Sequence, residues 1–598
     1  MITRRNYFSI MLMMAVLCGI FMFTMFVQES GSSYDINRFV VEELPTGADR
    51  WHATGGEELV LLLGGQDEAL CSTVEQWCTY SKRYFLQKET LADFSPENDG
   101  IPGLIIFDTK NLDFGKNYRD LVSLAELGVP LVFSGLPKTG DFETSPELCE
   151  ILGVKLKQPE VTVEGLRLFD GFFYGGPAEY IAKTDDDKKL QDFELTIPWL
   201  LTGSGTKTYM VGVMEDPSIK REEYPCLIWR NSYNNTRVFA VYGDYMSSLA
   251  GLGILSTFMY ELKNYELYPV VNAQNIIIDN FPNFTEENTE EIDRLYSRSP
   301  QMYFQGIMWP SLSALAKTNA LKLTCLFKPQ FDYTDTRYPD PDEVHFYLKQ
   351  LRELESEAGR SLGRMQDNSF NTMVVEDTAF YDGMKLRYRY ETTFANEEDL
   401  SMVKEALAEG GSLEKIVTVG SCYTNNAPLV SYITDGTTLQ CTTGTAEHHT
   451  YREDFTVRSV QTALLYSNVT MDLKNAVWPQ KEAHQWQHLF KEMSSNIQSY
   501  WSGNSGLEQT TLSQSDYRVR KFLNLDFETE KYGNTIDIRV EGSTDDVWFI
   551  LRTHDEKVTK VRGGKYKQLD ANMYLITAEE SLVKITVKPL SLKEQDEQ

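Results

Sequence analysis

The first hydrophobic pattern is a predominantly apolar run at residues 6–27, which follows Arg4 and Arg5 and contains no charged residue. A run of this length is sufficient to cross a bilayer, and basic residues before it favour a cytoplasmic N-terminus. It predicts a transmembrane signal anchor within residues 1–30, with most of the chain outside the cell. A cleaved signal peptide is the weaker interpretation, because no convincing small-x-small cleavage site follows. Residues 31–55 have little periodicity and are predicted to be a stalk.

The second pattern is an alternation of short apolar runs with amphipathic stretches. Over residues 56–268 it begins with the strand "EELVLLLGG" and the helix "STVEQWCTYSKRYFL", and it predicts a doubly wound α/β domain. The alternation continues over residues 269–505, with strands expected at "NIIIDN", "LKLTCLF", "TMVVED", "KIVTVGSC" and "TALLYSNV". This second region predicts a (β/α) barrel, whose chemistry would lie at the C-terminal ends of its strands.

The third pattern has a period of two and covers residues 506–598, which end in an acidic tail. Ile536, Ile538 and Val540 of "TIDIRVEG" share one face of a predicted strand, and "DVWFILRT" and "LVKITVKPL" repeat the pattern. We expect a small antiparallel β-sandwich. The whole chain is therefore expected to be a multidomain α/β protein.

Charge narrows the class of partner. The formal net charge of 598 residues is −30, which would repel nucleic acid and anionic lipid headgroups and would suit a cationic polymer. Solubility alone is an equally good explanation of this charge. The eight cysteines include no C-x-x-C pair, so neither a zinc ribbon nor a thioredoxin-type site is predicted.

Asp279 and Asn280 end the apolar strand "NIIIDN" and precede a Phe-Pro turn. An aspartate that caps an ordinary turn would give the same pattern. The stretch also resembles the first motif of polysaccharide deacetylase-like (NodB-type) barrels. That resemblance implies a catalytic base at Asp279 and, at the next position, an aspartate that binds a divalent metal together with two histidines four residues apart.

The order of the predicted domains adds a second resemblance. The segments "VFAVYGD" and "GLGILS" resemble the end of class I glutamine amidotransferase-like domains, although the G-x-C-x-G nucleophile motif is absent. Taken together, the anchor, this domain, the barrel and the β tail resemble membrane-anchored, deacetylase-like proteins encoded with Pel-type exopolysaccharide genes in Gram-positive bacteria.

The chain departs from the deacetylase motifs at every implied metal position. Asn280 stands where the metal-binding aspartate is expected, and an amide is a poorer ligand than a carboxylate. Aligning "ESEAGRSLGRMQ" on the histidine motif puts Ser361 and Met365 at the histidine positions. The late motif aligns with "YSNVTMDLKNAVW", where Asn468 and Met471 replace histidines. The resemblance therefore implies a catalytically impaired barrel.

Two further groups of residues are candidates for binding. His484 and His488 in "HQWQH" would lie on one face of a helix and are a weak candidate for a metal site, since no third ligand is assignable. Trp478, Trp486 and Trp501 fall in the late, rim-forming part of the barrel and could stack on sugar rings. Packing between the barrel and the β domain would explain these tryptophans equally well.

These observations predict a membrane-anchored, extracytoplasmic component of exopolysaccharide biosynthesis or export. Its pseudoenzyme barrel would bind polysaccharide, such as a cationic amino-sugar polymer, or would scaffold a membrane-embedded synthase or export protein. No cofactor is expected. One alternative is an active, zinc-dependent carbohydrate de-N-acetylase with Asp279 as its base. The other is a protein-interaction scaffold with no carbohydrate role.

Overall fold

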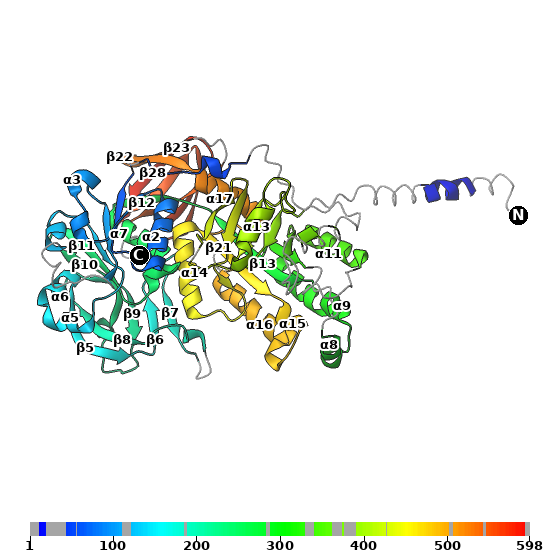
Figure 1. Ribbon diagram of the computed structural model, residues 1–598, viewed down its shortest axis with the longest axis horizontal. Helices are drawn as coiled ribbons and strands as arrows, with labels where there is room; N and C mark the ends of the chain where they lie inside the picture. The colour runs from blue at the N-terminus through cyan, green and yellow to red at the C-terminus, as the bar shows by residue number, and fades with distance from the viewer. Residues whose placement is uncertain are drawn as a thin grey trace.

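The computed structural model describes most of the chain, in a multidomain α/β arrangement (Figure 1). The described residues are 11–19 and 44–591, apart from gaps at 55–56, 110–120, 184–187, 283–287, 329–339, 362–373, 376–378, 380–389, 426, 502–505 and 542–545.

The predicted transmembrane helix is wrong as an element of the described fold. Residues 11–19 form a helix, whereas residues 6–10 and 20–27 of the apolar run lie outside the described residues. Among the described residues no helix is both long and apolar enough to cross a membrane.

The first α/β domain is built on a nine-stranded sheet of order β2-β1-β3-β4-β11-β10-β9-β6-β7. Strands β2, β1, β3, β4 and β11 are parallel, and the remaining strands extend the sheet in antiparallel fashion. The strands are β1 (Leu59–Leu63), β2 (Tyr84–Lys88), β3 (Leu104–Phe107), β4 (Leu131–Phe133), β6 (Gly165–Leu168), β7 (Ala178–Ile181), β9 (Lys207–Val213), β10 (Cys226–Tyr233) and β11 (Thr236–Val241).

Both faces of this sheet are covered. Val60 and Leu62 of β1 belong to a core that includes Trp77 of α2 (Glu68–Ser81) and Phe258 of α7 (Ala250–Leu262). The alternate residues of β1 pack into a second core on the other face, with α6 (Pro146–Leu152). The side chains of a strand alternate between faces, so an all-apolar strand is stable only when it is buried on both sides. A two-stranded sheet of β5 (Val154–Thr162) and β8 (Thr196–Thr202) and the helix α5 (Thr139–Thr144) complete the domain.

The second region forms an open half-barrel where a closed barrel is expected. Its nine strands have the order β18-β19-β17-β16-β15-β14-β13-β21-β20, so β18 and β20 are edges. All neighbours are parallel except β18 and β19. The strands are β13 (Ala273–Phe281), β14 (Leu323–Phe327), β15 (Glu357–Ser361), β16 (Thr392–Phe394), β17 (Thr418–Ser421), β18 (Val430–Thr434), β19 (Thr437–Cys441), β20 (Gly444–Thr445) and β21 (Tyr466–Asp472).

The half-barrel stays open because the chain bends after β19. Strand β20, which has two residues, pairs with β21, backbone hydrogen bonds from Thr443 to Asn468 and from Ala446 to Thr470 flank it, and side chains add further contacts. Asn468 of β21 donates its amide to the carbonyl oxygens of Gln440 and Cys441 at 3.4 and 3.2 Å. A side-chain bridge satisfies buried polar groups but does not continue the backbone ladder.

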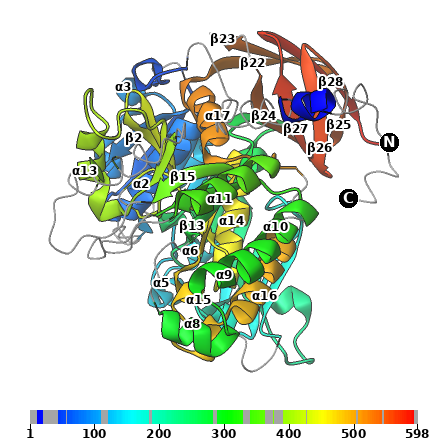
Figure 2. The same ribbon diagram turned by 90° about the vertical axis from the view of Figure 1, so that its right-hand side faces the viewer.

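Two strands of this region differ from their expected positions. Within "TMVVED" the described residues Val374 and Val375 are helical, and "TALLYSNV" is divided between the end of α14 and the start of β21. The helices of the half-barrel are α8 (Thr289–Tyr296), α9 (Pro300–Tyr303), α10 (Trp309–Thr318), α11 (Pro341–Glu353), α13 (Leu400–Ala406), α14 (Tyr451–Leu464), α15 (Lys474–Val477) and α16 (Trp486–Asn496). Figure 2 shows that α8, α9, α15 and α16 gather at one end of the molecule, opposite the C-terminal strands.

The half-barrel packs closely on the first domain through α14 and α7. The amide N–H of Gly253 in α7 donates to the hydroxyl of Ser459 in α14 at 2.9 Å. A Cβ at Gly253 would lie 2.3 Å from the carbonyl oxygen of Ser459, so any larger residue would push the helices apart.

The C-terminal region begins with α17 (Leu512–Asn524), which packs on the half-barrel, and continues as a β-sandwich. One sheet has the order β12-β24-β27-β26 and the other β22-β23-β28-β25. Strand β12 (Tyr265–Val270) precedes the half-barrel in sequence but pairs with β24. The other strands are β22 (Asp526–Tyr532), β23 (Thr535–Glu541), β24 (Val547–Thr553), β25 (Glu556–Arg562), β26 (Gly564–Asp570), β27 (Met573–Ala578) and β28 (Leu582–Pro589).

Candidate functional site

The carboxyl ends of β14, β13 and β21 form one edge of the half-barrel, which we call the carboxyl edge. Asp279 of β13 lies directly opposite Asp472 of β21 in the parallel register. Lys328 follows β14, and its amide N–H donates to the carbonyl oxygen of Phe281 at 3.4 Å. Ends of neighbouring parallel strands lie at the same edge of a sheet, so residues far apart in sequence meet here.

Asn280 is the centre of this edge. Its backbone has a φ of 55°, a left-handed conformation that Asn tolerates better than most residues, and its N–H is bonded to Asp279 Oδ1 at 2.8 Å. The side-chain oxygen of Asn280 accepts a hydrogen bond from Lys328 Nζ at 2.7 Å, and its NH₂ group donates to Asp472 Oδ1. The amide thus links an ammonium group to a carboxylate.

Burial and neighbouring negative charge raise the pKa values of two acids near this edge, Asp472 and Glu447. Burial and the nearby Asp279 raise the pKa of Asp472, although the amide of Asn280 and the charge of Lys328 oppose the shift. Burial also raises the pKa of Glu447 to about 8. Glu447 accepts a hydrogen bond from the backbone N–H of Asp472, which connects the two groups. Burial and, to a smaller extent, the negative charge of Asp279 raise the pKa of the Cys422 thiol, so this cysteine is a poor nucleophile.

The residues present do not fit a catalytic zinc ion. Both polar ends of the Asn280 side chain are used by Lys328 and Asp472, and Met471 is 1% exposed in an apolar core. Asn468 lies below the edge, where it bridges to β19, and Ser361 is buried at the end of β15. Met365 lies outside the described residues. Within the described part of the chain, no group of three or more His, Cys, Asp or Glu residues is arranged to hold a metal ion.

The two candidate histidines do not share a helix. His484 ends a 3₁₀ turn (Glu482–His484), Gln485 is extended, and His488 belongs to α16. His488 Nε2 lies 3.8 Å from Glu482 Oε1, and His484 Nδ1 accepts the N–H of Gln480 at 3.4 Å. Partial burial and nearby positive charge lower the pKa of His484.

The three tryptophans occupy different environments. Trp478 is 38% exposed and follows α15, whose first residue, Lys474, donates its N–H to Asp472 Oδ1 at 2.8 Å. Trp478 is therefore separated from Asp472 in the chain by little more than one helical turn. Trp486 is 3% exposed and packs in the core against Phe490, so it offers no open face to a sugar. The side chain of Trp501 lies outside the described residues.

Sequence reasoning missed three residues of the edge: Asp472, Lys328 and Glu447. Asp472 ends the strand "YSNVTMD", whose mixture of polar and apolar residues is a weaker signal than the apolar run before Asp279. Lys328 and Glu447 come from connections between elements and carry no pattern of their own. Only the strand order brings them to Asp279.

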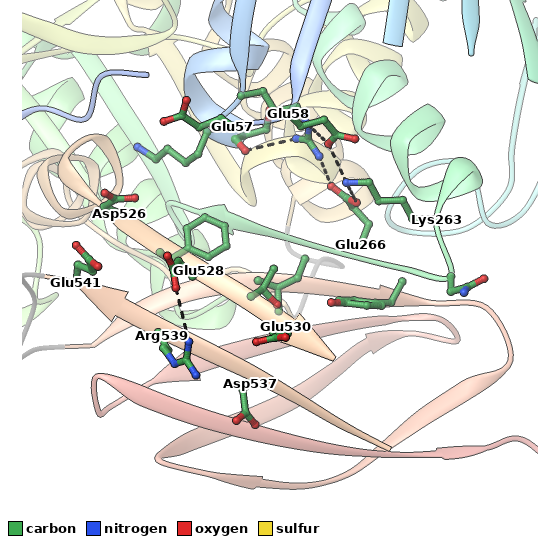
Figure 3. Close-up of a pocket in the computed structure, with 18 of the residues that line it drawn as sticks. Glu57, Glu58, Lys263, Glu266, Asp526, Glu528, Glu530, Asp537, Arg539 and Glu541 are labelled. Carbon is green, nitrogen blue, oxygen red and sulfur yellow. Dashed lines mark hydrogen bonds and ion pairs between the residues drawn. The ribbon is translucent and has the colours of Figure 1, made fainter. Parts of the chain in front are cut away.

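A hollow lies between the first domain and the sandwich, and we call it the acidic groove. Its volume is about 960 Å³. Figure 3 shows Glu58, Glu266 and Lys263 on one wall and Glu528 with Arg539 on the other. Further carboxylates line the second wall, namely Asp526, Glu530, Asp537 and Glu541.

The two walls of the acidic groove are neutralised differently. Arg83, which is 6% exposed, contacts both Glu58 and Glu266, and Lys263 contacts the same two acids. Burial alone would raise the pKa of Glu58, but Arg83 and Lys263 hold it below its ordinary value. On the other wall, Asp526 lies directly opposite Glu541, and Glu530 opposite Asp537, across β22 and β23. These are like-charged pairs, which are unfavourable at neighbouring positions of a sheet.

The first domain has a cavity of about 750 Å³ at the carboxyl ends of its parallel strands. Asp67 and Asp108 follow β1 and β3, which flank the point where the strand order reverses, a common ligand position in such sheets. Arg452 reaches this cavity from α14 and contacts Asp244. Among the described residues that line it there is neither Cys nor His, so it does not hold the thiol and imidazole of an amidotransferase.

Residues 191–364 match the family DUF2194, described as an uncharacterised protein conserved in bacteria. No curated protein matches the sequence. Among solved structures, the chain is similar to Agd3, described as a novel carbohydrate deacetylase. That match has 10% identity and a TM-score of 0.48, and it covers 90% of this chain and 99% of Agd3.

Two further structures match about a third of the chain. One is an exo-beta-1,4-mannosidase, Op5Man5, from Opitutaceae bacterium strain TAV5, with 12% identity, a TM-score of 0.24, and coverage of 34% of this chain and 36% of that chain. The other is a ThuA-like protein from Bacteroides uniformis ATCC 8492, with 11% identity, a TM-score of 0.22, and coverage of 36% of this chain and 94% of that chain.

Proposed function

We propose that this protein is a deacetylase-like, polysaccharide-binding protein whose half-barrel has lost metal-dependent hydrolysis. The observation that carries this proposal is the Asn280 side chain, bonded to Lys328 on one side and to Asp472 on the other. At this position the deacetylase-like motif implies a carboxylate that binds a metal. The one oxygen of this amide already accepts from the ammonium group of Lys328, whose positive charge opposes a second cation at the same oxygen.

Binding without hydrolysis is consistent with the rest of the carboxyl edge. Sugar rings stack on exposed aromatic faces, and the exposed Trp478 follows the short helix that begins at Lys474, beside Asp472. Carboxylates accept hydrogen bonds from sugar hydroxyl groups, and they attract the ammonium group of a de-N-acetylated amino sugar. The carboxylates of the acidic groove would attract the same class of polymer over a longer range.

A binding protein of this kind would act in the biosynthesis or export of an exopolysaccharide, as a polymer-binding or scaffolding component. Its extracytoplasmic location, its synthase or export partners and its lack of a cofactor stay predictions. An active carbohydrate de-N-acetylase is the competing function, and it requires ligands other than those of the described edge.

The test is binding of glucosamine and galactosamine oligomers to the purified chain, measured by calorimetry for partly de-N-acetylated and fully acetylated forms. We expect stronger binding of the de-N-acetylated form, weakened by salt, and no release of acetate. Acetate release that depends on added zinc and disappears in Asp279→Ala would overturn the proposal in favour of the enzyme. An absence of binding to every oligomer would favour the scaffold without a carbohydrate role.

A further inference from the structure

The carboxyl edge holds two carboxylates side by side at the end of a parallel strand pair. Asp279 and Asp472 are direct neighbours in the register of β13 and β21, whose backbones run about 4.8 Å apart. Like charges at such positions repel each other, and the repulsion is stronger where the surrounding protein excludes part of the water. A positive charge at this edge would therefore offset the repulsion between the two groups.

Lys328 is placed to supply that charge. Its Nζ lies 2.7 Å from the side-chain oxygen of Asn280, and the NH₂ group of the same amide donates to Asp472 Oδ1. The two ends of one amide are thus oriented by a cation and an anion, which polarise it in the same direction. The backbone of Lys328 is fixed by its hydrogen bond to Phe281, the residue that follows Asn280.

We infer that Lys328 is a tethered cation that takes the place of a metal ion at the carboxyl edge, acting on Asp472 through Asn280. This inference rests on the proposed loss of the metal site and identifies what balances the charge of the two aspartates. Lys328 is a positioning residue in this role, since it orients Asn280 and Asp472. An ammonium group carries half the charge of a divalent metal, so the edge keeps net negative charge for a cationic ligand.

The test is a double-mutant cycle on the full chain, with Lys328→Met and Asp472→Asn, followed by thermal and denaturant unfolding. Lys328→Met should lower the free energy of unfolding, whereas Lys328→Arg should keep most of it. The double variant should lose less unfolding free energy than the two single variants lose together. We expect a coupling of more than about threefold in the unfolding constant. Lys565→Met is the matched control, because Lys565 forms an exposed ion pair with Glu579.

Addition of a divalent cation provides a second readout. Millimolar Mg²⁺ or Mn²⁺ should raise the melting temperature of Lys328→Met more than that of the parent chain or of Lys565→Met, because the vacated position favours a cation. Should Lys328→Met fail to fold, the comparison of Asp472→Asn with the double variant measures the same charge. Additive effects together with no differential response to divalent cations would overturn the inference. Oligomer binding is measured separately, so failure of the proposed function would not alter this result.

Discussion

The carboxyl edge and the acidic groove are both rich in carboxylates, but they balance this charge in different ways. In the groove, the buried Arg83 touches Glu58 and Glu266 directly, and Lys263 adds a second positive charge to the same wall. At the edge, the amide of Asn280 lies between Lys328 and Asp472 and is hydrogen-bonded to both. Direct pairing of buried groups ties their charge to folding, whereas indirect or exposed charges are available to a ligand. The stability of one site and the binding of the other should therefore respond to different substitutions.

The largest effect is expected for Arg83→Met in the groove. This change leaves Glu266, which is 3% exposed, beside only Lys263, and breaking a buried ion pair costs about 3–5 kcal/mol. Denaturant unfolding of the full chain measures the loss. Arg539→Met is the control, because Arg539 is 57% exposed and its pair with Glu528 is 3.7 Å long, so we expect a loss below about 1 kcal/mol. Equal losses of unfolding free energy in the two variants would contradict the view that only the wall with Arg83 depends on its ion pairs for stability.

A pH effect of intermediate size is expected at the edge. Burial raises the pKa of Glu447 in the folded chain from 4.5 to about 8, so between these values the folded state binds more protons than the unfolded state. Stability is therefore greatest at low pH for this group and falls as pH rises toward 8. Glu447→Gln should remove about 3 kcal/mol of the difference in unfolding free energy between pH 5.5 and pH 8.5. A parent chain that becomes more stable over this interval, with the same slope in the variant, would contradict the assignment.

A smaller effect, on binding only, is expected for the aromatic face beside the edge. Trp478→Ala should weaken binding of de-N-acetylated oligomers by about two- to tenfold, the range expected from the loss of one aromatic contact. Unfolding should change little, because the side chain is 38% exposed. Tyr566→Ala, at a 41% exposed aromatic of the sandwich, is the matched control and should bind as the parent does. Equal binding by the two variants would remove Trp478 from the site.

The smallest effect is expected on the exposed wall of the groove. Glu530→Gln relieves the repulsion from Asp537 on the neighbouring strand and leaves the 2.8 Å ion pair of Asp537 with Lys584 in place, so stability should rise or stay within about 0.5 kcal/mol of the parent. Thermal unfolding at low and high salt measures this change, which should be smaller at high salt. A loss of several kcal/mol would mean that this wall is as structural as the wall that holds Arg83.

The sequence predicts which residues end strand β13 better than it predicts which side chains contact them. Asp279 and Asn280 lie at the end of β13, as the apolar run in "NIIIDN" predicts, because a strand buried on both faces leaves a recognisable pattern. The contacts of Asn280 could not be predicted, since Lys328 and Asp472 lie 48 and 192 residues further along the chain. Their proximity depends on β14 and β21 flanking β13, an order that periodicity does not encode.

The sequence also predicts where strands lie along the chain more clearly than it predicts which sheet each strand joins. "YELYPV" reads as the end of the first domain, yet β12 pairs with β24, which is nearly 300 residues away. A (β/α) barrel is expected over residues 269–505, but the chain after β19 forms only the two residues of β20, where the sheet ends as an open edge. Backbone pairing over such separations depends on tertiary packing, which local patterns do not specify.

The central claim is that the carboxyl edge balances its charge with Lys328 and has lost the donors of a metal site. The most direct test is the zinc content of the purified full chain after zinc loading and dialysis, determined by elemental analysis for the parent and for Asp279→Ala. The account predicts zinc far below one ion per chain in both proteins. Nearly one zinc ion per parent chain, absent from Asp279→Ala, would contradict it and show that a metal centre is present at this edge.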